Sequence, residues 1–191
     1  MAEKKEDKRI RYTKIFLKES LINLLKVKPI NKITIKEICD GADVNRATFY
    51  AYYNDPQGLL EEIELEVRDN INNHLNSFNY ESEDSELKDM MKKILEYVNQ
   101  NAELCMILIG QNGETSFVKK LTSFIQERYI RLYQLHKSVE QVTAEYIYTF
   151  VASGCVGIIQ KWMVEGRKIS TDEMAELLVD LAINGINNIK M

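Results

Sequence analysis

A short stretch around residue 46 carries side chains suited to reading the edges of DNA bases. Arg46 can donate two hydrogen bonds to the major-groove edge of guanine. Ala47 is small enough to permit close approach and to touch a thymine methyl group. A helix of about eight residues is roughly 12 Å long, and the major groove is about 12 Å wide. The exposed face of a helix at this place would therefore fit the groove end-on.

Two short helices within residues 33–53 must position these side chains. Thr34 is a good N-cap for the first helix, and Glu37 stands three residues later, which is capping-box spacing. Apolar residues then recur at helical spacing, namely Ile35, Ile38, Cys39 and Ala42. Gly41 and Asp43 flank the expected end of this helix, because either residue tolerates the left-handed backbone of a sharp turn.

The second helix begins after Asn45, which is a favoured N-cap residue. Phe49 and Tyr53 lie four residues apart on one side of it, and we expect this pair to be core. The other sides stack Arg46 with Tyr50, Ala47 with Ala51, and Thr48 with Tyr52. The pattern predicts a second helix whose outer face is open to a partner.

The run from Thr34 to Leu60, TIKEICDGADVNRATFYAYYNDPQGLL, resembles the DNA-binding domain of the TetR family of bacterial transcriptional regulators. Its specific features are the T-F-Y near the end of the second helix, an aromatic residue three positions later, and Leu-Leu after a short gap. The segment GCVGIIQKWMVEG, with TDEMAELL after it, resembles the C-terminal domain of a TetR subgroup common in low-GC Gram-positive bacteria. The resemblance covers nearly the whole chain and is most specific in its first sixty residues.

The resemblance implies roles for the outer face. It implies that Thr48, Tyr50 and Tyr52 hold phosphates or flank base contacts, whereas packing on neighbouring helices is the alternative role of the two tyrosines. Thr34 stands at a helix N-terminus, where N–H groups and a hydroxyl can meet a phosphate. The predicted DNA-binding residues are Thr34, Lys36, Asn45, Arg46, Ala47, Thr48, Tyr50 and Tyr52.

The chain departs from the family pattern at two positions. Asp43 stands where the family often has Gly, and Pro56 stands where it often has a phosphate-binding Lys. Lys32, Lys36 or basic residues of an N-terminal arm could compensate for that Lys. Residues 1–9 lack a hydrophobic pattern and are expected to form this arm, which either reaches DNA or only aids solubility.

Charge is divided unequally along the chain. The net charge is −4 over 191 residues, which by itself argues against a nucleic-acid partner. Residues 1–55 carry 12 basic and 8 acidic side chains, a net of +4, whereas residues 56–191 have a net of −8. An acidic body with a basic end would keep DNA at one surface.

Composition bounds the class of protein. The 45% hydrophobic content suffices for a core, and 28% charged residues suit a soluble protein. We find no apolar run approaching about 18 residues and no apolar region at the N-terminus, so we expect neither a membrane span nor a secretory signal. The predicted location is the cytoplasm.

Residues that could bind metal or perform catalysis are scattered. Cys39, Cys105 and Cys155 stand singly in apolar pattern, far from His74 and His136. No zinc site, metal site or catalytic triad follows from such spacing, and no cofactor is expected. Buried reduced thiols are the main interpretation of the cysteines, and a redox-sensing thiol is the alternative. The sequence therefore does not favour an enzyme.

The remaining helices form a C-terminal body. Periodicity predicts helices at about 10–27, 56–74, 86–100, 102–109, 114–136, 139–165 and 171–190. The polar stretch 77–85 is the best candidate for a domain boundary. An acidic outer face on the 56–74 helix is expected to be solvated; it comprises Glu61, Glu62, Glu64, Glu66 and Asp69.

The apolar stripes of this body could either be core or line a cavity for a small molecule. The candidate pocket residues are Met91, Leu95, Phe117, Leu121, Phe124 and Phe150. Gly154 and Gly157 in mid-helix suggest close approach of another helix. The last two helices offer more apolar surface than one neighbour can bury, and TetR-like regulators usually dimerise through them. The candidate dimer residues are Gly154, Ile158, Trp162, Leu178 and Leu181.

These observations predict an all-α protein of about nine helices, with a three-helix DNA-binding domain at 1–55 and a helical effector-binding and dimerisation domain at 56–191. The predicted function is a ligand-responsive repressor that binds a palindromic DNA operator as a homodimer, with an unknown small-molecule effector. The alternative is a helical ligand-binding or adaptor protein that no longer binds DNA, which Pro56 and the acidic balance favour slightly.

Overall fold

The computed structural model describes residues 8–76, 84–109, 117–124 and 140–187. In these ranges the chain forms helices joined by short turns and contains no strand, which confirms the all-α prediction. The helices are α1 (Lys8–Leu25), α2 (Ile35–Ala42), α3 (Arg46–Tyr50), α4 (Pro56–Asn76), α5 (Asp84–Gln100), α6 (Ala102–Ile109), α8 (Gln141–Val164) and α9 (Thr171–Asn187). Residues 117–124 are also helical, and a 3-10 turn, Ile30–Lys32, follows α1.

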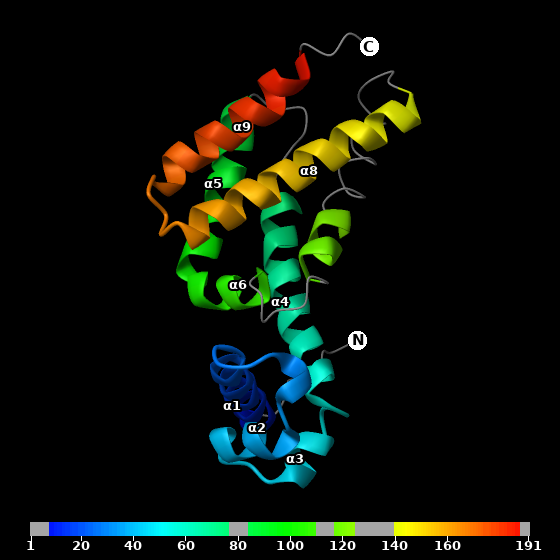
Figure 1. The fold of residues 1–191 in the computed structure, drawn as a ribbon, viewed down its shortest axis with the longest axis vertical. Helices are drawn as coiled ribbons and strands as arrows, with labels where there is room; N and C mark the ends of the chain where they lie inside the picture. Colours follow the sequence, from blue (N-terminus) through cyan, green and yellow to red (C-terminus); the bar gives the residue numbers. More distant parts are fainter. Residues whose placement is uncertain (1–7, 77–83, 110–116, 125–139, 188–191) are drawn as a thin grey trace.

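The molecule has two ends joined by α4. Figure 1 shows α1, α2 and α3 together at one end, and α5, α6, α8 and α9 at the other. The long helix α4 packs against α1 near its start and against α5 farther along. The division between residues 55 and 56 stays a prediction, because α4 takes part in the packing of both ends.

Helices α1 and α2 approach closely at a glycine. We expected Gly41 to mark the end of α2, but it lies within the helix, and a Cβ there would stand 2.4 Å from the Ser20 Oγ. That hydroxyl is buried and donates a hydrogen bond to the Ile38 carbonyl oxygen at 2.9 Å. Of Gly41 and Asp43, only Asp43 takes the left-handed conformation, with φ 53° and ψ 44°. Gly41 therefore serves helix packing, and Asp43 makes the turn.

The helix that follows this turn is shorter than expected. Helix α3 contains five residues instead of about eight. The chain then tightens into a turn in which the N–H groups of Tyr52 and Tyr53 both lie 3.0 Å from the Phe49 carbonyl oxygen. Phe49 and Tyr53 are buried. Their inward direction leaves the opposite side of α3 exposed.

The N-terminal arm expectation is wrong for its last two residues. Lys8 and Arg9 form the first turn of α1, and residues 1–7 lie outside the described ranges. At the start of α4, Asp55 accepts a hydrogen bond from the Gly58 N–H at 2.8 Å, and Pro56 is the first helical residue. At the start of α9, Ser170 and Glu173 exchange cap hydrogen bonds of 2.8 and 3.2 Å.

Helix α8 is apolar on more than one side. The expectation of no membrane span stays a prediction: Val142–Val164 is long and apolar enough to cross a membrane, by length and composition only, and 22% of its most apolar stretch is buried. The expected close helix approach at Gly154 and Gly157 is absent within the described part of the chain, where nothing lies within 4 Å of a Cβ built at either position. No described residue therefore covers the surface of α8 at these two glycines.

Candidate nucleic-acid interface and internal cavity

The outer side of α3 presents the base-reading candidates. Arg46 and Ala47 are exposed, and Tyr50 is 58% exposed. Asn45 caps the helix, since its Oδ1 accepts from the Thr48 N–H at 2.7 Å and from the Thr48 hydroxyl at 3.0 Å. The side chains of Asn45 and Thr48 are therefore engaged in the hydrogen bonds of the N-cap. Arg46, Ala47 and Tyr50 are left to face a partner.

Thr34 and Glu37 form the expected capping box at the start of α2. The Thr34 N–H and hydroxyl donate to the Glu37 Oε2 at 3.0 and 2.8 Å. The Lys28 ammonium, followed by these Thr34 donors, lowers the pKa of Glu37 to about 2. Both donors of Thr34 are therefore directed to a carboxylate. The exposed Lys36 has no such partner among the described residues.

Four lysines at the end of the molecule that contains α1–α3 are engaged with carboxylates. Lys28 pairs with Glu37, Lys26 with Glu103, and both Lys14 and Lys18 with Glu62. Other cations of this end have no carboxylate partner in the described ranges; they include Arg11, Lys32, Lys36 and Arg46. The cations of this second group are available to phosphate groups.

Tyr52 differs from Tyr50 in its surroundings. It is half-buried, its ring packs edge-on to Tyr53 at 6.4 Å between centroids, and the Lys14 ammonium lies 5.9 Å from its centre. Tyr52 therefore occupies the position of a packing residue, which was the alternative role given for the two tyrosines. Tyr50 only touches Phe49 with its edge, at 6.0 Å.

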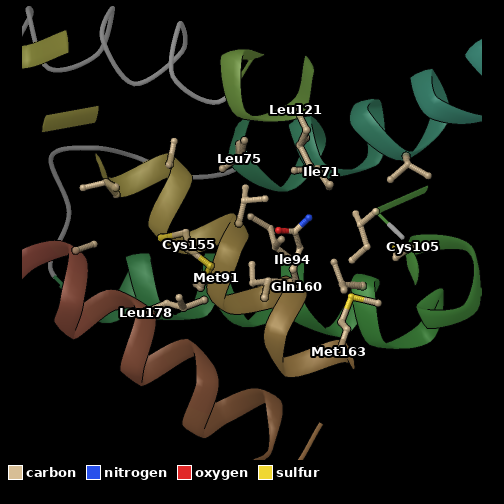
Figure 2. A pocket seen from close by; sticks show the side chains of 18 of the residues that line it. Ile71, Leu75, Met91, Ile94, Cys105, Leu121, Cys155, Gln160, Met163 and Leu178 are labelled. Carbon is tan, nitrogen blue, oxygen red and sulfur yellow. The ribbon is translucent and has the colours of Figure 1, made fainter. Parts of the chain in front are cut away.

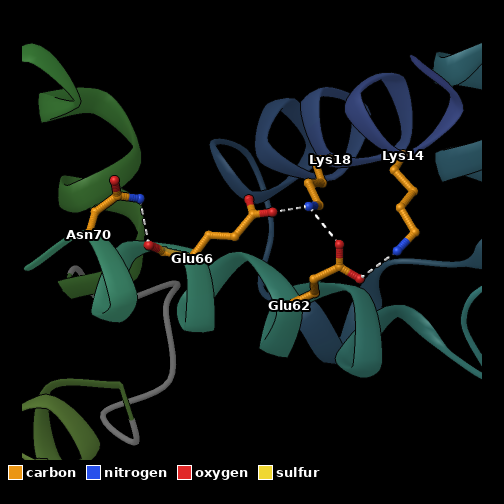
Figure 3. Close-up of polar contacts among 5 residues, drawn as sticks. All are labelled: Lys14, Lys18, Glu62, Glu66 and Asn70. Carbon is orange, nitrogen blue, oxygen red and sulfur yellow. Dashed lines mark hydrogen bonds and ion pairs between the residues drawn. The ribbon is translucent and has the colours of Figure 1, made fainter. Parts of the chain in front are cut away.

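A cluster of ion pairs, Lys14, Lys18, Glu62 and Glu66, joins α1 to α4 (Figure 3). The Lys18 Nζ lies 2.7 Å from Glu62 Oε1 and 2.5 Å from Glu66 Oε1, and Lys14 lies 3.5 Å from Glu62. Burial alone would lower the pKa of Lys18, but its bonds to Glu62 and Glu66 outweigh burial and raise it. Burial would likewise raise the pKa of Glu62, but hydrogen bonds from Lys18 and Tyr53 lower it.

This cluster corrects the expected solvated face of α4. Glu62 and Glu66 bind α1, and Glu64 is only 5% exposed with its carboxylate 3.0 Å from Lys120. The sequence pattern could not reveal these pairs because the partners are about fifty residues apart. The reading head formed by α1–α3 is thereby fixed to α4.

An internal cavity of about 160 Å³ lies among α4, α5, α6, residues 117–124, α8 and α9 (Figure 2). Predicted residues Met91, Phe117 and Leu121 line it. The other three predicted residues are not among the described residues that line it. Leu95 is fully buried in the packed core, Phe124 is half-buried with its ring 5.5 Å from the Arg68 guanidinium, and Phe150 is 69% exposed.

The cavity also contains residues that the sequence reasoning missed. Cys105, Cys155, Gln160 and Met163 line it. A signal for Gln160 existed, since it lies four residues after Val156 and three before Met163, on an apolar side of α8. Burial raises the pKa of Cys105 and of Cys155 to about 11, so both are neutral thiols and poor redox sensors.

The candidate dimer residues fall on two sides of the C-terminal helices. Gly154 and Leu181 are exposed, and Ile158 is half-buried. Trp162 and Leu178 point inward, which corrects their predicted role: the Trp162 Nε1 donates to the Ile169 carbonyl oxygen at 2.9 Å, and Leu178 lines the cavity. Eight residues separate Trp162 from Gly154, which turns it about 80° around the helix.

A comparison with known proteins places this arrangement in context. A family model described as "Transcriptional regulator C-terminal region", of TetR type, matches residues 85–184. The chain is 22% identical over 172 residues to the uncharacterized HTH-type transcriptional regulator YxbF from Bacillus subtilis (strain 168). The aligned region covers 86% of this chain and 43% of that protein, so the chain spans less than half the length of this relative.

Three solved structures share the fold. A TetR regulator from Streptococcus agalactiae 2603V has a TM-score of 0.70 at 19% identity and covers 93% of this chain and 97% of its own. A TetR-like regulator from Rhodococcus sp. RHA1 has a TM-score of 0.69 at 19% identity, covering 92% and 96%. FadR from Bacillus subtilis, in complex with stearoyl-CoA, has a TM-score of 0.63 at 12% identity, covering 90% and 98%.

The family model and the solved structures support different statements about this chain. Because their identities to this chain are below 25%, the solved structures establish the fold alone. The family model spans more than half of the sequence and includes every described residue that lines the cavity except those of α4. This chain belongs to the TetR family of transcriptional regulators.

Proposed function

We propose that the chain is a ligand-responsive repressor that binds a pseudo-palindromic DNA operator as a homodimer. One observation carries the DNA-binding part: α3 turns Arg46, Ala47 and Tyr50 outward while Phe49, on its other side, is fully buried. Arg46 is the base reader, and Lys32, Lys36 and Arg11 are the phosphate-binding cations. Membership in a family of transcriptional regulators also argues against an enzyme.

The homodimer part rests on an exposed apolar stripe on α8 and α9. Val142, Tyr146, Phe150 and Val164 are each more than half exposed, at spacings that place them along one side of α8 with Gly154 and Gly157. Leu177 and Leu181 are exposed on α9, which packs against α8. A large apolar patch of this kind marks an interaction surface. In a dimer it accounts for the membrane-like composition of α8 in a protein of the cytoplasm.

Ligand response would act through α4. Val67, Ile71 and Leu75 of this helix line the cavity, and Glu62 and Glu66 of the same helix hold α1. The opposite wall belongs to α8, whose outer side carries the dimer stripe. A ligand that favours one position of α4 relative to α8 therefore shifts the separation of the two reading heads, in proportion to its differential affinity for the two positions. The solved FadR with stearoyl-CoA provides an example of this fold with a ligand.

A DNA-binding titration tests the proposal. Fluorescence anisotropy of the full chain on DNA flanking its own gene should show binding that weakens steeply with salt. Half-sites should lie about 34 Å apart, or a multiple of this distance. Arg46→Ala should weaken binding by about 1 to 3 kcal/mol and relax the base preference at one position of each half-site.

The matched control is Lys93→Ala, which removes one exposed positive charge from α5. It should leave DNA affinity unchanged within error. If Arg46→Ala binds all operator variants as the parent chain does, the base-reading role is wrong. Absence of DNA binding at low salt would instead favour the adaptor function.

A further inference from the structure

We propose that the effector is a neutral, ring-sized apolar molecule with one hydrogen-bonding group, held in the cavity by the side-chain amide of Gln160. This inference rests on the ligand-responsive function proposed above. It names the chemical class that the cavity accepts. It excludes both long acyl chains and charged small molecules.

Size is the first reason. The cavity volume is about 160 Å³. An apolar cavity of about 150 Å³ in another protein binds benzene, whereas pockets for drug-sized ligands have volumes of about 300 Å³ or more. The space therefore suits a single ring with one substituent, and a long acyl chain of the kind bound by the FadR relative exceeds it.

Lack of charge is the second reason. The described lining contains no Asp, Glu, Lys, Arg or His, and its two cysteines are neutral thiols. A second pocket, which contains charged residues, shares Phe117 and Leu121 with the cavity. There Glu64 and Lys120 already pair with each other at 3.0 Å. An ionised ligand in the apolar cavity would lose its hydration without a counter-charge, which is strongly unfavourable.

The amide of Gln160 is the third reason. In Figure 2 its nitrogen and oxygen lie in the middle of the cavity, surrounded by carbon and sulfur atoms of the labelled side chains. Within the described part of the chain no residue hydrogen-bonds to this amide. Gln160 is half-buried, and a ligand that cuts its amide off from water costs free energy unless the ligand hydrogen-bonds to it. Because an amide can both donate and accept, a hydroxyl or ring N–H of a ligand would satisfy it.

Calorimetric titration and thermal unfolding of the full chain test this class with four probes: phenol, toluene, benzoate and stearate. Phenol should bind and raise the Tm, toluene should bind about 3- to 10-fold more weakly because it lacks the hydrogen bond, and benzoate and stearate should not bind at the same concentrations. Binding of benzoate or stearate as tight as that of phenol would overturn the inference, and so would absence of binding by both phenol and toluene.

Substitution of the amide isolates its role. Gln160→Leu should abolish the preference for phenol but keep toluene binding, which also shows that the cavity remains folded. Gln100→Leu, at the exposed end of α5, is the matched control and should behave as the parent chain. Retention of the phenol preference in Gln160→Leu would show that the amide is not the ligand-binding group.

The same probes separate this inference from the proposed function. Binding is measured without DNA, and the change in operator affinity is measured separately. If phenol binds but operator affinity does not change, the ligand class stands and the regulatory mechanism fails. If the chain binds its operator while neither phenol nor toluene binds, the ligand class fails and the DNA-binding function stands.

Discussion

Gly41→Ala tests the close contact between α1 and α2, on which the placement of the reading helix α3 depends. The substitution is conservative in a helix, and by propensity alone it should stabilise the protein by up to about 1 kcal/mol. The added Cβ, however, would lie 2.4 Å from the Ser20 Oγ. The sign of the effect is therefore decided by this contact.

The size of the cost follows from what Ser20 must do. If its hydroxyl rotates away, the buried hydrogen bond to the Ile38 carbonyl oxygen is lost and the hydroxyl is left without a partner, which costs about 1 to 3 kcal/mol. If the helices separate instead, overpacking costs about the same. After the gain in propensity, Gly41→Ala should lower the free energy of unfolding by about 1 kcal/mol.

Removing the hydroxyl should reverse the sign. In a Ser20→Ala background the nearest remaining side-chain atom is the Ser20 Cβ position, 3.4 Å away, which is an acceptable contact. There Gly41→Ala should stabilise the protein, so the coupling between the two sites should be about 2 kcal/mol, well above the error for independent sites. Gly58→Ala is the control, because its Cβ would stand 3.7 Å from Asp55 Oδ1 and meet no clash.

Urea denaturation followed by far-ultraviolet circular dichroism measures all four variants of this cycle and the control. Operator affinity measured on the same samples should fall for Gly41→Ala and recover in the double variant. A stabilising effect of Gly41→Ala in the parent chain, equal to that in the Ser20→Ala background, would refute the close contact.

Three further predictions concern the turn, the α1–α4 cluster and the dimer stripe. Asp43→Gly should raise the free energy of unfolding, measured by urea denaturation, by up to about 1 kcal/mol, because the left-handed φ of 53° favours glycine. A decrease of the same size in this free energy would contradict the explanation. The pKa of Glu62 is lower in the folded protein than its ordinary value of 4.5, so the stability that Glu62 contributes is present above pH 4.5 and is lost as the pH falls through the folded pKa. Lys18→Met removes the nearer lysine partner of Glu62 and should therefore flatten the acid side of a plot of Tm against pH. An unchanged plot would argue against the cluster. Phe150→Glu, at a residue 69% exposed, should convert a dimer to a monomer in sedimentation measurements, whereas Lys93→Glu, at an exposed position of α5 outside the stripe, should not; a dimer that survives Phe150→Glu would remove the stripe from the interface.

Local signals in the amino-acid sequence were sufficient to place most helices. The Thr34–Glu37 capping box, the Asn45 cap and the start of α4 at residue 56 were predicted and are present. The buried pair Phe49 and Tyr53 followed from its spacing alone. Each of these features depends on residues within about four positions of one another, which helical geometry brings together in any fold.

Features that join distant parts of the chain required the tertiary structure. Helix α8 is apolar on several sides, so its pattern could not decide that Trp162 turns inward and Phe150 outward. Lys18 meets Glu62 across two helices, and Gly41 is needed only because Ser20 packs against it. These contacts depend on how helices orient after folding, and a one-dimensional pattern contains no information about orientation where more than one side could be buried. For that reason the exposed side of α3 was predictable, but the residues of the cavity and the exposed side of α8 were not.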